Sequence, residues 1–303
     1  MTQIISTVAE SKPSKSTRSF LAYFGHHKAG SSAIVSMLDS ICSEICLKPG
    51  PCFDAKIFDY DLENFIESKK VDFLLYTNAD YQYTRSLTNY KGFHVVRDPR
   101  DTLVSAYFSH LYSHPTTNWS ELIPYREKLT QLSKDEGLIA EMDFSSVFFE
   151  QMYSWNYSQP NICEMKMEDL FKDSLDNFAK IFRFLGILSD SEDLRNPPIS
   201  TDLVRFINKV HFKTNGMSPF CFKKKAISYA ELKQKTERIS FNNKAKGRKK
   251  GQENVKNHYR KGVPGDWKNH LNPKHIELFK DRYNDVILKL GYESDPDWWK
   301  NYI

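Results

Sequence analysis

The fold is decided by residues 19–46, SFLAYFGHHKAGSSAIVSMLDSICSEIC. The first part of this stretch, residues 19–24, is short, apolar and aromatic, as a buried parallel strand should be. After a turn, apolar residues recur at helical spacing, at Ile34, Leu38, Ile41 and Ile45. The stretch therefore predicts a strand, a turn and a helix.

The turn between these two elements, residues 25–32, has the composition of an anion-binding loop. The first N–H groups of a helix have no helical partner and the helix dipole is positive there. Lys28 adds a full charge, and small residues complete the turn: Gly25, Gly30, Ser31 and Ser32. The nucleotide-triphosphatase loop is excluded, because here the lysine comes before the second glycine. Taken alone, the turn fits an ordinary strand-to-helix connection equally well.

The composition is that of a globular protein with a local basic surplus. The chain has 303 residues, 14% of them aromatic, and 43 Lys and Arg against 38 Asp and Glu give a net charge of +5. Eight of these cations lie in residues 244–261. We expect residues 244–259 to form a mobile basic loop that meets an anion or is solvated. A role in nucleic-acid binding is disfavoured, because acidic residues interrupt the run and no RNA or DNA motif accompanies it.

Cysteine usage and the N-terminal residues predict a cytoplasmic protein. The five cysteines are odd in number and contain no CxxC pair, so neither a disulfide framework nor a zinc site is expected, and the thiols should be reduced. Residues 1–18 are rich in Ser, Thr and Lys and are expected to be a flexible tail rather than a signal peptide or anchor. No stretch is long and apolar enough to span a membrane.

Further strands and helices alternate along the chain. Strands are expected at 71–76, 93–96 and 161–167, and none between 47 and 70, where Pro, Gly and charges mix. Helices are expected near 101–113, 119–133, 138–157, 200–211 and 273–290, with one more ending at Gly186. This alternation predicts an α/β fold, a single domain over residues 19–303 whose central parallel sheet has helices on both faces.

The turn after the third strand resembles the first turn in its chemistry. Residues 97–101, RDPRD, follow the strand at 93–96, and Asp98 with Pro99 forms a good helix start. In a parallel sheet, ligands bind at the carboxyl ends of the strands. The two turns should therefore share one edge and bind one ligand with two separated anionic groups.

Three motifs together carry a resemblance to a known family: HHKAGSS at 26–32, RDPRDTLVSAY at 97–107 and RKGVPGDWKNHL at 260–271. In this order they resemble the sulfotransferases that use 3′-phosphoadenosine 5′-phosphosulfate (PAPS), the cytosolic type most closely. The resemblance extends to MEDL at 167–170, FLGI at 184–187 and ISYAELK at 227–233, and so covers nearly the whole chain from residue 19. It implies a P-loop-like domain.

The resemblance also implies a set of ligands for PAPS and its product PAP. The 5′-phosphosulfate would be held by Lys28, Ala29, Gly30, Ser31 and Ser32. The 3′-phosphate would be held by Arg97, Ser105, Arg260, Lys261 and Gly262. The chain has Ala33 and Met167 where the family has aromatic adenine contacts, so the adenine would pack on Tyr229. Transfer would be an in-line displacement in which Lys28 stabilises charge on the leaving oxygen, and no metal is required.

The general base departs from the family pattern. The family places a histidine just after the second strand, whereas this chain reads YTNAD at 76–80, with Asn78 in the place of the histidine. Because an amide cannot accept a proton at neutral pH, the base must be another residue. His27 and Asp80 are the nearby candidates. The family's dimer motif is also replaced, by Asn272 and Pro273, which leaves the oligomeric state open.

Two function classes follow. The leading hypothesis is an enzyme that sulfates a hydroxyl or nitrogen of a small molecule, a specialised secondary metabolite because the usual base is absent. The alternative is a protein that binds PAPS or PAP with little or no turnover. No nucleic-acid or membrane partner is expected in either case.

Overall fold

A five-stranded parallel sheet forms the centre of the computed structural model, which describes residues 18–189, 200–214 and 220–302. The strand order is β2 (Pro49–Cys52), β3 (Phe73–Tyr76), β1 (Phe20–Gly25), β4 (Tyr90–Val96) and β5 (Ile162–Lys166). All four neighbouring pairs are parallel. The α/β prediction and its four strands are therefore confirmed.

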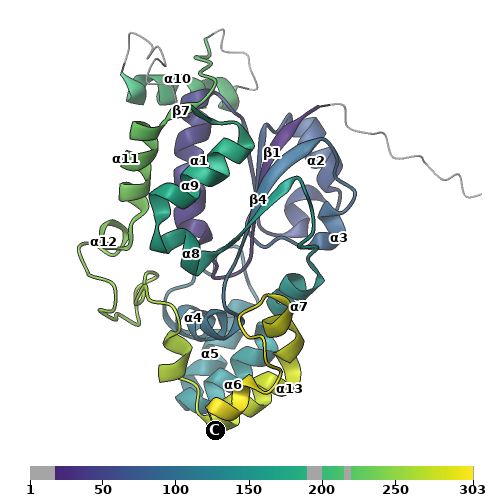
Figure 1. Ribbon diagram of the computed structural model, residues 1–303, viewed down its shortest axis with the longest axis vertical. Coiled ribbons are helices and arrows are strands. Elements are labelled where there is room, and N and C mark those ends of the chain that lie inside the picture. Colours follow the sequence, from purple (N-terminus) through teal and green to yellow (C-terminus); the bar gives the residue numbers. More distant parts are fainter. Residues whose placement is uncertain (1–17, 190–199, 215–219, 303) are drawn as a thin grey trace, which may run out of the picture.

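Helices cover both faces of the sheet (Figure 1). On one face, Tyr23 packs with α1 (Ser31–Ile45), α9 (Ser174–Leu185) and α11 (Tyr229–Ile239) in one core cluster. On the other face, Phe24 packs with α2 (Leu62–Lys69) in a second cluster. Successive strand residues point to opposite faces, so a strand buried on both sides reads as one apolar run.

The edge strand β2 and helix α2 correct the prediction for residues 47–70. Pro49 and Pro51 in β2 weaken the strand signal, but β2 pairs only with β3. An edge strand tolerates proline because one of its sides needs no ladder donors. Asp61 is the N-cap of helix α2, and its side chain accepts a hydrogen bond from the backbone N–H of Asn64.

A helical layer lies beyond the carboxyl edge of the sheet. It consists of α4 (Pro99–Tyr112), α5 (Leu122–Gln131), α6 (Lys134–Phe144), α7 (Ser146–Ser154) and α13 (Pro273–Lys289). The predicted start of α4 is confirmed: Asp98 accepts from the backbone N–H of Arg100 at 2.9 Å. The single helix predicted at 138–157 is wrong, because the chain breaks at Ser145 into α6 and α7.

The remaining elements are short or peripheral. They are η1 (Ala55–Phe58), α3 (Tyr81–Thr84), α8 (Met167–Lys172), β6 (Leu188–Ser189), α10 (Thr201–Lys213), β7 (Ile227–Ser228), α12 (Phe241–Lys244), η2 (Asp266–Asn269) and η3 (Trp298–Asn301). The predicted tail lies almost entirely outside the described residues. Among the helices of the described ranges, none has the length and apolar character needed to cross a membrane.

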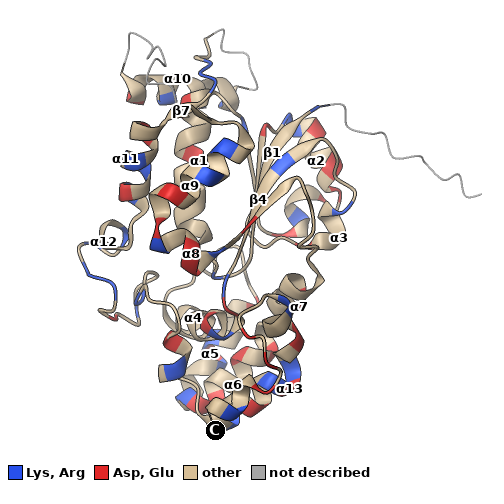
Figure 2. Ribbon diagram, viewed as in Figure 1, with Lys and Arg blue, Asp and Glu red and all other residues tan. Residues whose placement is uncertain are grey.

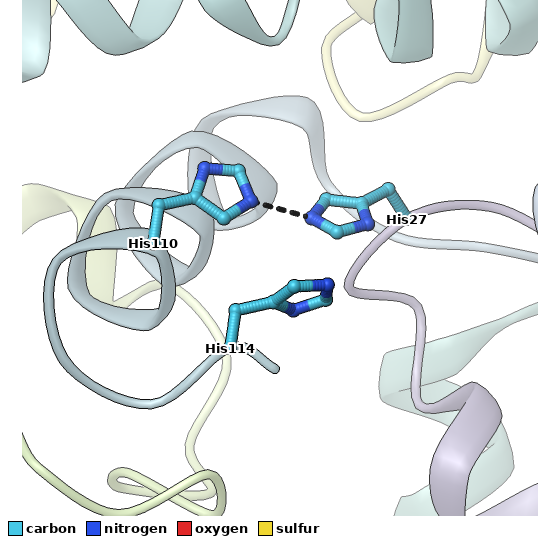
Figure 3. Close-up of side chains that lie close together, drawn as sticks. All are labelled: His27, His110 and His114. Carbon is cyan, nitrogen blue, oxygen red and sulfur yellow. Dashed lines mark hydrogen bonds between the residues drawn. The ribbon is translucent and has the colours of Figure 1, made fainter. Parts of the chain in front are cut away.

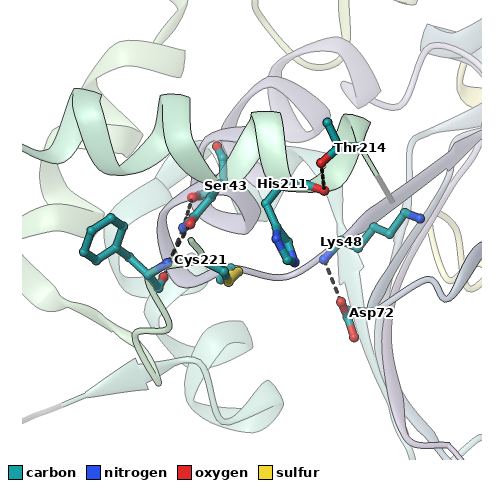
Figure 4. Close-up of a disulfide and its surroundings, with 9 residues drawn as sticks. Ser43, Lys48, Asp72, His211, Thr214 and Cys221 are labelled. Atoms are coloured by element: carbon teal, nitrogen blue, oxygen red, sulfur yellow. Dashed lines mark hydrogen bonds between the residues drawn. A yellow bond between two sulfur atoms is a disulfide. The ribbon is translucent and has the colours of Figure 1, made fainter. Parts of the chain in front are cut away.

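A disulfide between Cys46 and Cys221 corrects the expectation of reduced thiols (Figure 4). Cys46 follows the end of α1, and Cys221 lies 175 residues later, so no spacing pattern could reveal the pair. Asn208 on α10 brings the two segments together, since its amide donates to the carbonyls of Ser43 and Phe222. The disulfide therefore attaches the C-terminal end of α1 to the segment beyond α10.

Candidate active site

The loop between β1 and α1 has the backbone geometry of an anion cradle. Gly30 is the N-cap of α1, with a left-handed φ of 81°, and no side chain caps this helix. A Cβ at Gly30 would lie 2.8 Å from the ring of Phe171, so only glycine fits here. The uncapped N–H groups of a long helix thus remain available to an anion.

Lys28 lies in this loop in a strained and electropositive position. Its φ is 62°, a left-handed conformation that a residue with a side chain seldom adopts. Burial, followed by the positive charges of Arg97 and Arg260, lowers the pKa of the Lys28 ammonium to about 7, and Glu141 opposes this shift. Three cations from three separate motifs therefore act on one another here.

The turn after β4 meets the loop after β1, as predicted. β1 and β4 are neighbours in the sheet, and Arg97, the first residue after β4, donates from Nη1 to the carbonyl oxygen of Lys28 at 3.2 Å. Ser105 lies on α4 and is half-buried. The two turns thus share the carboxyl edge of the sheet.

Arg260 and Lys261 are held by Asp266 rather than lying unpaired. Asp266 accepts from Arg260 and Lys261 at 2.5 Å each, and Arg260 also pairs with Glu253. Burial raises the pKa of Asp266, but hydrogen bonds from four neighbours, that from His270 foremost, together outweigh burial and hold the pKa well below its usual range. Gly262 has a φ of 72°, and a Cβ there would lie 2.3 Å from the ring of Phe241. Any phosphate at Arg260 and Lys261 must therefore share them with Asp266.

The basic residues 244–259 fold back on the third motif (Figure 2). Arg248 donates to the carbonyls of Tyr259 and Arg260, and Gly251 N–H donates to the carbonyl of Lys261 at 2.9 Å. Lys250 reaches the carbonyl oxygen of Phe171 at 3.1 Å, next to the loop. The basic stretch thus lies beside the anion cradle.

Tyr229, the predicted adenine contact, lies at the start of α11. Its hydroxyl donates to Asp176 on α9 at 3.1 Å, and 39% of the residue is exposed. The ring of Phe171 approaches Gly30, and the ring of Phe241 approaches Gly262. The described residues therefore offer two other rings close to the cradle.

Asn78 and Asp80, which follow β3 and were considered for the general base, both form hydrogen bonds to nearby residues. Asp80 is the N-cap of α3 and accepts from both the backbone N–H and the side-chain amide of Gln82. Asn78 donates to the carbonyl of Phe53 at 3.1 Å. Both side chains thus have a local role at the start of α3 or in the adjoining loop.

His27 belongs to a buried chain of polar side chains that spacing alone could not reveal (Figure 3). Its Nε2 lies 3.0 Å from Nε2 of His110 on α4, and Nδ1 of His110 lies 2.9 Å from Glu141 on α6. His114, which follows α4, lies beside both rings. The only sequence signal was the four-residue spacing of His110 and His114, a spacing that places two side chains on one side of a helix, although α4 ends at Tyr112, before His114.

A second, separate series of hydrogen-bonded side chains contains His26. Its Nε2 lies 2.8 Å from Nε2 of His94 on β4, and Nδ1 of His94 lies 2.6 Å from Glu164 on β5. Glu164 also accepts from the indole of Trp155 at 2.9 Å. The two adjacent histidines of the loop thus point to different Glu–His pairs.

Two groups of the described side chains offer three possible ligand atoms each within 4.8 Å: His27, His110 and His114, and Glu253, Asp266 and His270. In the second group, Asp266 is already paired with Arg260 and Lys261. In the first group, the hydrogen bond between His27 and His110 occupies the two facing nitrogens. We assign no metal to either group.

Comparison with known proteins finds similarity to sulfotransferases. Residues 81–198 match the model of the sulfotransferase domain. A 3-alpha-hydroxysteroid sulfotransferase of Cavia porcellus is 28% identical over 213 residues, which is 69% of this chain and 60% of that protein. Sulfotransferase 2A6 of Mus musculus is 27% identical over 201 residues, 65% of this chain and 56% of that protein. The chain thus spans less than two thirds of the length of these curated relatives.

The fold is shared with a solved structure. The crystal structure of mouse sulfotransferase SULT7A1 complexed with PAP superposes with a TM-score of 0.55 at 16% identity, over 96% of this chain and 91% of that one. The matched domain contains the Arg97 turn and Ser105, and the curated relatives agree with it. The family resemblance that the motifs carry is thus supported over residues 81–198 by the sulfotransferase domain model and by the curated relatives.

Proposed function

We propose that this chain is an enzyme that transfers a sulfuryl group from PAPS to a hydroxyl or nitrogen of a small molecule and releases PAP. One observation carries the proposal: Lys28, Arg97 and Arg260 come from three motifs, yet their charges act on one another at the carboxyl edge of the sheet. Such a concentration of positive charge next to an uncapped helix N-terminus fits a ligand with several anionic groups. The related mouse protein with the same fold was solved with PAP.

The donor would lie across the cradle in the order that the motifs give. Lys28, Ala29, Gly30, Ser31 and Ser32 would hold the 5′-phosphosulfate, and Arg97, Ser105, Arg260, Lys261 and Gly262 the 3′-phosphate. In this arrangement Lys28 offsets the negative charge that develops on the leaving oxygen. The rings of Phe171 and Phe241 are alternatives to Tyr229 as the surface on which the adenine would pack.

The acceptor would lie on the side of the loop where aromatic rings gather. The ring of His27 stacks on Phe148 at 4.2 Å, and Trp119 packs edge-on against it at 5.8 Å. Aromatic walls favour an apolar, ring-containing acceptor with one polar group. The name of the Cavia porcellus relative suggests a hydroxysteroid as one class of acceptor. In its narrower form, our proposal is that the acceptor is a specialised secondary metabolite.

A mass-spectrometric screen tests the proposal. The purified chain is incubated with PAPS and a panel of hydroxysteroids, phenols, alcohols and amines, and each product is examined for one added sulfuryl group together with release of PAP. Sulfation of at least one class supports the enzyme. Tight binding of PAP without transfer to any acceptor would instead support the binding protein, which the replacement of the usual base by Asn78 favours.

Proton uptake on PAP binding is expected as a consequence of the Lys28 environment. Because the pKa of Lys28 is about 7 in the free chain, roughly half of these side chains are neutral near that pH. A bound phosphate favours the charged form and raises the pKa, so PAP binding should take up protons near pH 8 and weaken as the pH rises above 7. Calorimetry in buffers of different ionisation enthalpy measures this uptake, and an equal uptake in Lys28→Met would contradict the assignment.

A further inference from the structure

A buried carboxylate on α6 is connected to the loop through two imidazole rings. Glu141 has no exposed surface, and its Oε1 lies 2.9 Å from Nδ1 of His110, which is also fully buried. Nε2 of His110 in turn lies 3.0 Å from Nε2 of His27, which is 6% exposed. Glu141 also accepts from the hydroxyls of Tyr125 and Ser145. The carboxylate is thus fully hydrogen-bonded and fixed in place.

The donors and acceptors in the hydrogen bonds that join Glu141, His110 and His27 follow from the charge of the carboxylate. An ionised carboxylate only accepts, so the Nδ1–H of His110 must donate to Glu141, and Nε2 of His110 then carries a lone pair. The Nε2–H of His27 therefore donates to His110. This assignment leaves the lone pair of His27 on Nδ1, which has no hydrogen-bond partner within the described ranges. A proton acceptor thus lies in the loop, one residue before Lys28.

We propose that His27 is the general base of the reaction and that His110 and Glu141 are positioning residues that act through it. The proposal rests on the proposed sulfotransferase function and supplies the base that Asn78 cannot be. It also excludes Asp80, whose carboxylate caps α3. Neither His110 nor Glu141 belongs to the motifs that carry the family resemblance.

The bonds and the protons of the proposed step balance. The acceptor oxygen or nitrogen forms a bond to the sulfur of PAPS as the bond from that sulfur to the 5′-phosphate oxygen breaks, and the acceptor's proton passes to Nδ1 of His27. The Nε2 proton of His27 can then move to Nε2 of His110. The resulting imidazolium at His110 lies against the Glu141 carboxylate, which offsets its charge.

The surroundings of His27 explain why a carboxylate is needed. Burial, the neighbouring His110 and the charge of Lys28 hold the pKa of His27 well below its usual value, and His114 and His258 act in the same direction. These groups keep His27 neutral and able to accept a proton at neutral pH, but they oppose the cation formed by that proton. Glu141 is the anion that faces these groups, and it reaches His27 through His110.

The neighbouring chain of His26, His94 and Glu164 is a matched control within the same molecule. It contains the same sequence of carboxylate, imidazole and imidazole. However, Nδ1 of His26 is buried without a partner, so no acceptor can reach it. Neutralising Glu164 therefore makes the same chemical change without affecting the general base.

The test compares Glu141→Gln, His27→Ala and Glu164→Gln by their pH profiles. We expect kcat to fall by about 10²-fold or more in Glu141→Gln and His27→Ala, with little change in the Kd for PAP. In Glu141→Gln the acid-side midpoint of kcat should move to lower pH, because the imidazolium has lost its anion. Added imidazole should restore part of the activity of His27→Ala, and Glu164→Gln should keep the wild-type profile.

Several outcomes would overturn the proposal. Wild-type kcat in His27→Ala, or equal losses in Glu141→Gln and Glu164→Gln, would exclude the relay while leaving the sulfotransferase function standing. Activity that required added Zn²⁺ and was lost with a chelator would show that the histidines bind metal instead. If Glu141→Gln does not fold, ¹⁵N NMR of the wild-type imidazoles decides, since a proton on Nδ1 of His27 at pH 8 contradicts the assignment. Absence of transfer by the wild-type chain would reject the proposed function itself.

Discussion

Sulfuryl transfer by Lys28→Ala is expected to be about 10²–10³-fold slower than by the wild-type chain, the usual effect of removing one charge-stabilising donor. The charges of Arg97 and Arg260 act on the Lys28 ammonium, and in our proposal this ammonium meets the oxygen on which charge develops. Alanine keeps the Cβ and hence the backbone demand of the left-handed turn, so the change removes the charge and little else. Single-turnover kinetics with saturating PAPS measure the effect.

The control for this variant is Lys209→Ala. Lys209 lies on α10, is 49% exposed and pairs with Asp39, so its loss changes the net charge equally without touching the loop. Its kcat should remain within about twofold of the wild type, because surface ion pairs contribute little. Equal losses in both variants would show that net charge, rather than Lys28, accounts for the effect.

Trp267→Ala is expected to lower the free energy of unfolding by about 3–5 kcal/mol, as for other truncated core aromatics. Trp267 is 1% exposed, and its backbone N–H donates to the buried Asp101 at 2.9 Å. The guanidinium of Arg100 lies 4.2 Å from its ring, so truncation leaves this buried cation without one of its two aromatic neighbours. Urea denaturation followed by circular dichroism measures the change.

Trp299→Ala provides the matched comparison for this stability prediction. Trp299 is half-buried and packs at the margin of the same cluster, so its truncation should cost clearly less than that of Trp267. A loss below about 1 kcal/mol in Trp267→Ala would contradict a core role. It would also mean that the RKGVPGDW segment does not depend on this tryptophan for its attachment to α4.

The sequence was informative where the chain is regular. The apolar runs that became β1, β3, β4 and β5 are long enough to be recognised, and Asp98 with Pro99 located the start of α4 to within a residue or two. By contrast, β2 contains two prolines and was missed, because an edge position tolerates residues that a central strand excludes. Local patterns thus indicate elements but not their neighbours.

In the candidate site, too, some contacts could be predicted from the sequence and others could not. Lys28 lies in the loop after β1 and Arg97 directly follows β4, so the expected sheet topology predicted that they would meet. The link from His27 to Glu141 depends on how α4 and α6 pack, and the disulfide of Cys46 depends on how α10 packs on α1. Contacts of this kind join distant parts of the chain and have no local signature. A single sequence could not supply them.

At position 28, the left-handed backbone favours one residue for stability, and the proposed reaction favours another. With a φ of 62°, this position would suit glycine better than lysine by about 1 kcal/mol, so the lysine is kept at a cost in stability. A search for stabilising substitutions would favour glycine here and would discard the ammonium group that we propose stabilises the leaving oxygen. In a directed-evolution experiment, position 28 is therefore where thermostability and turnover would trade against each other.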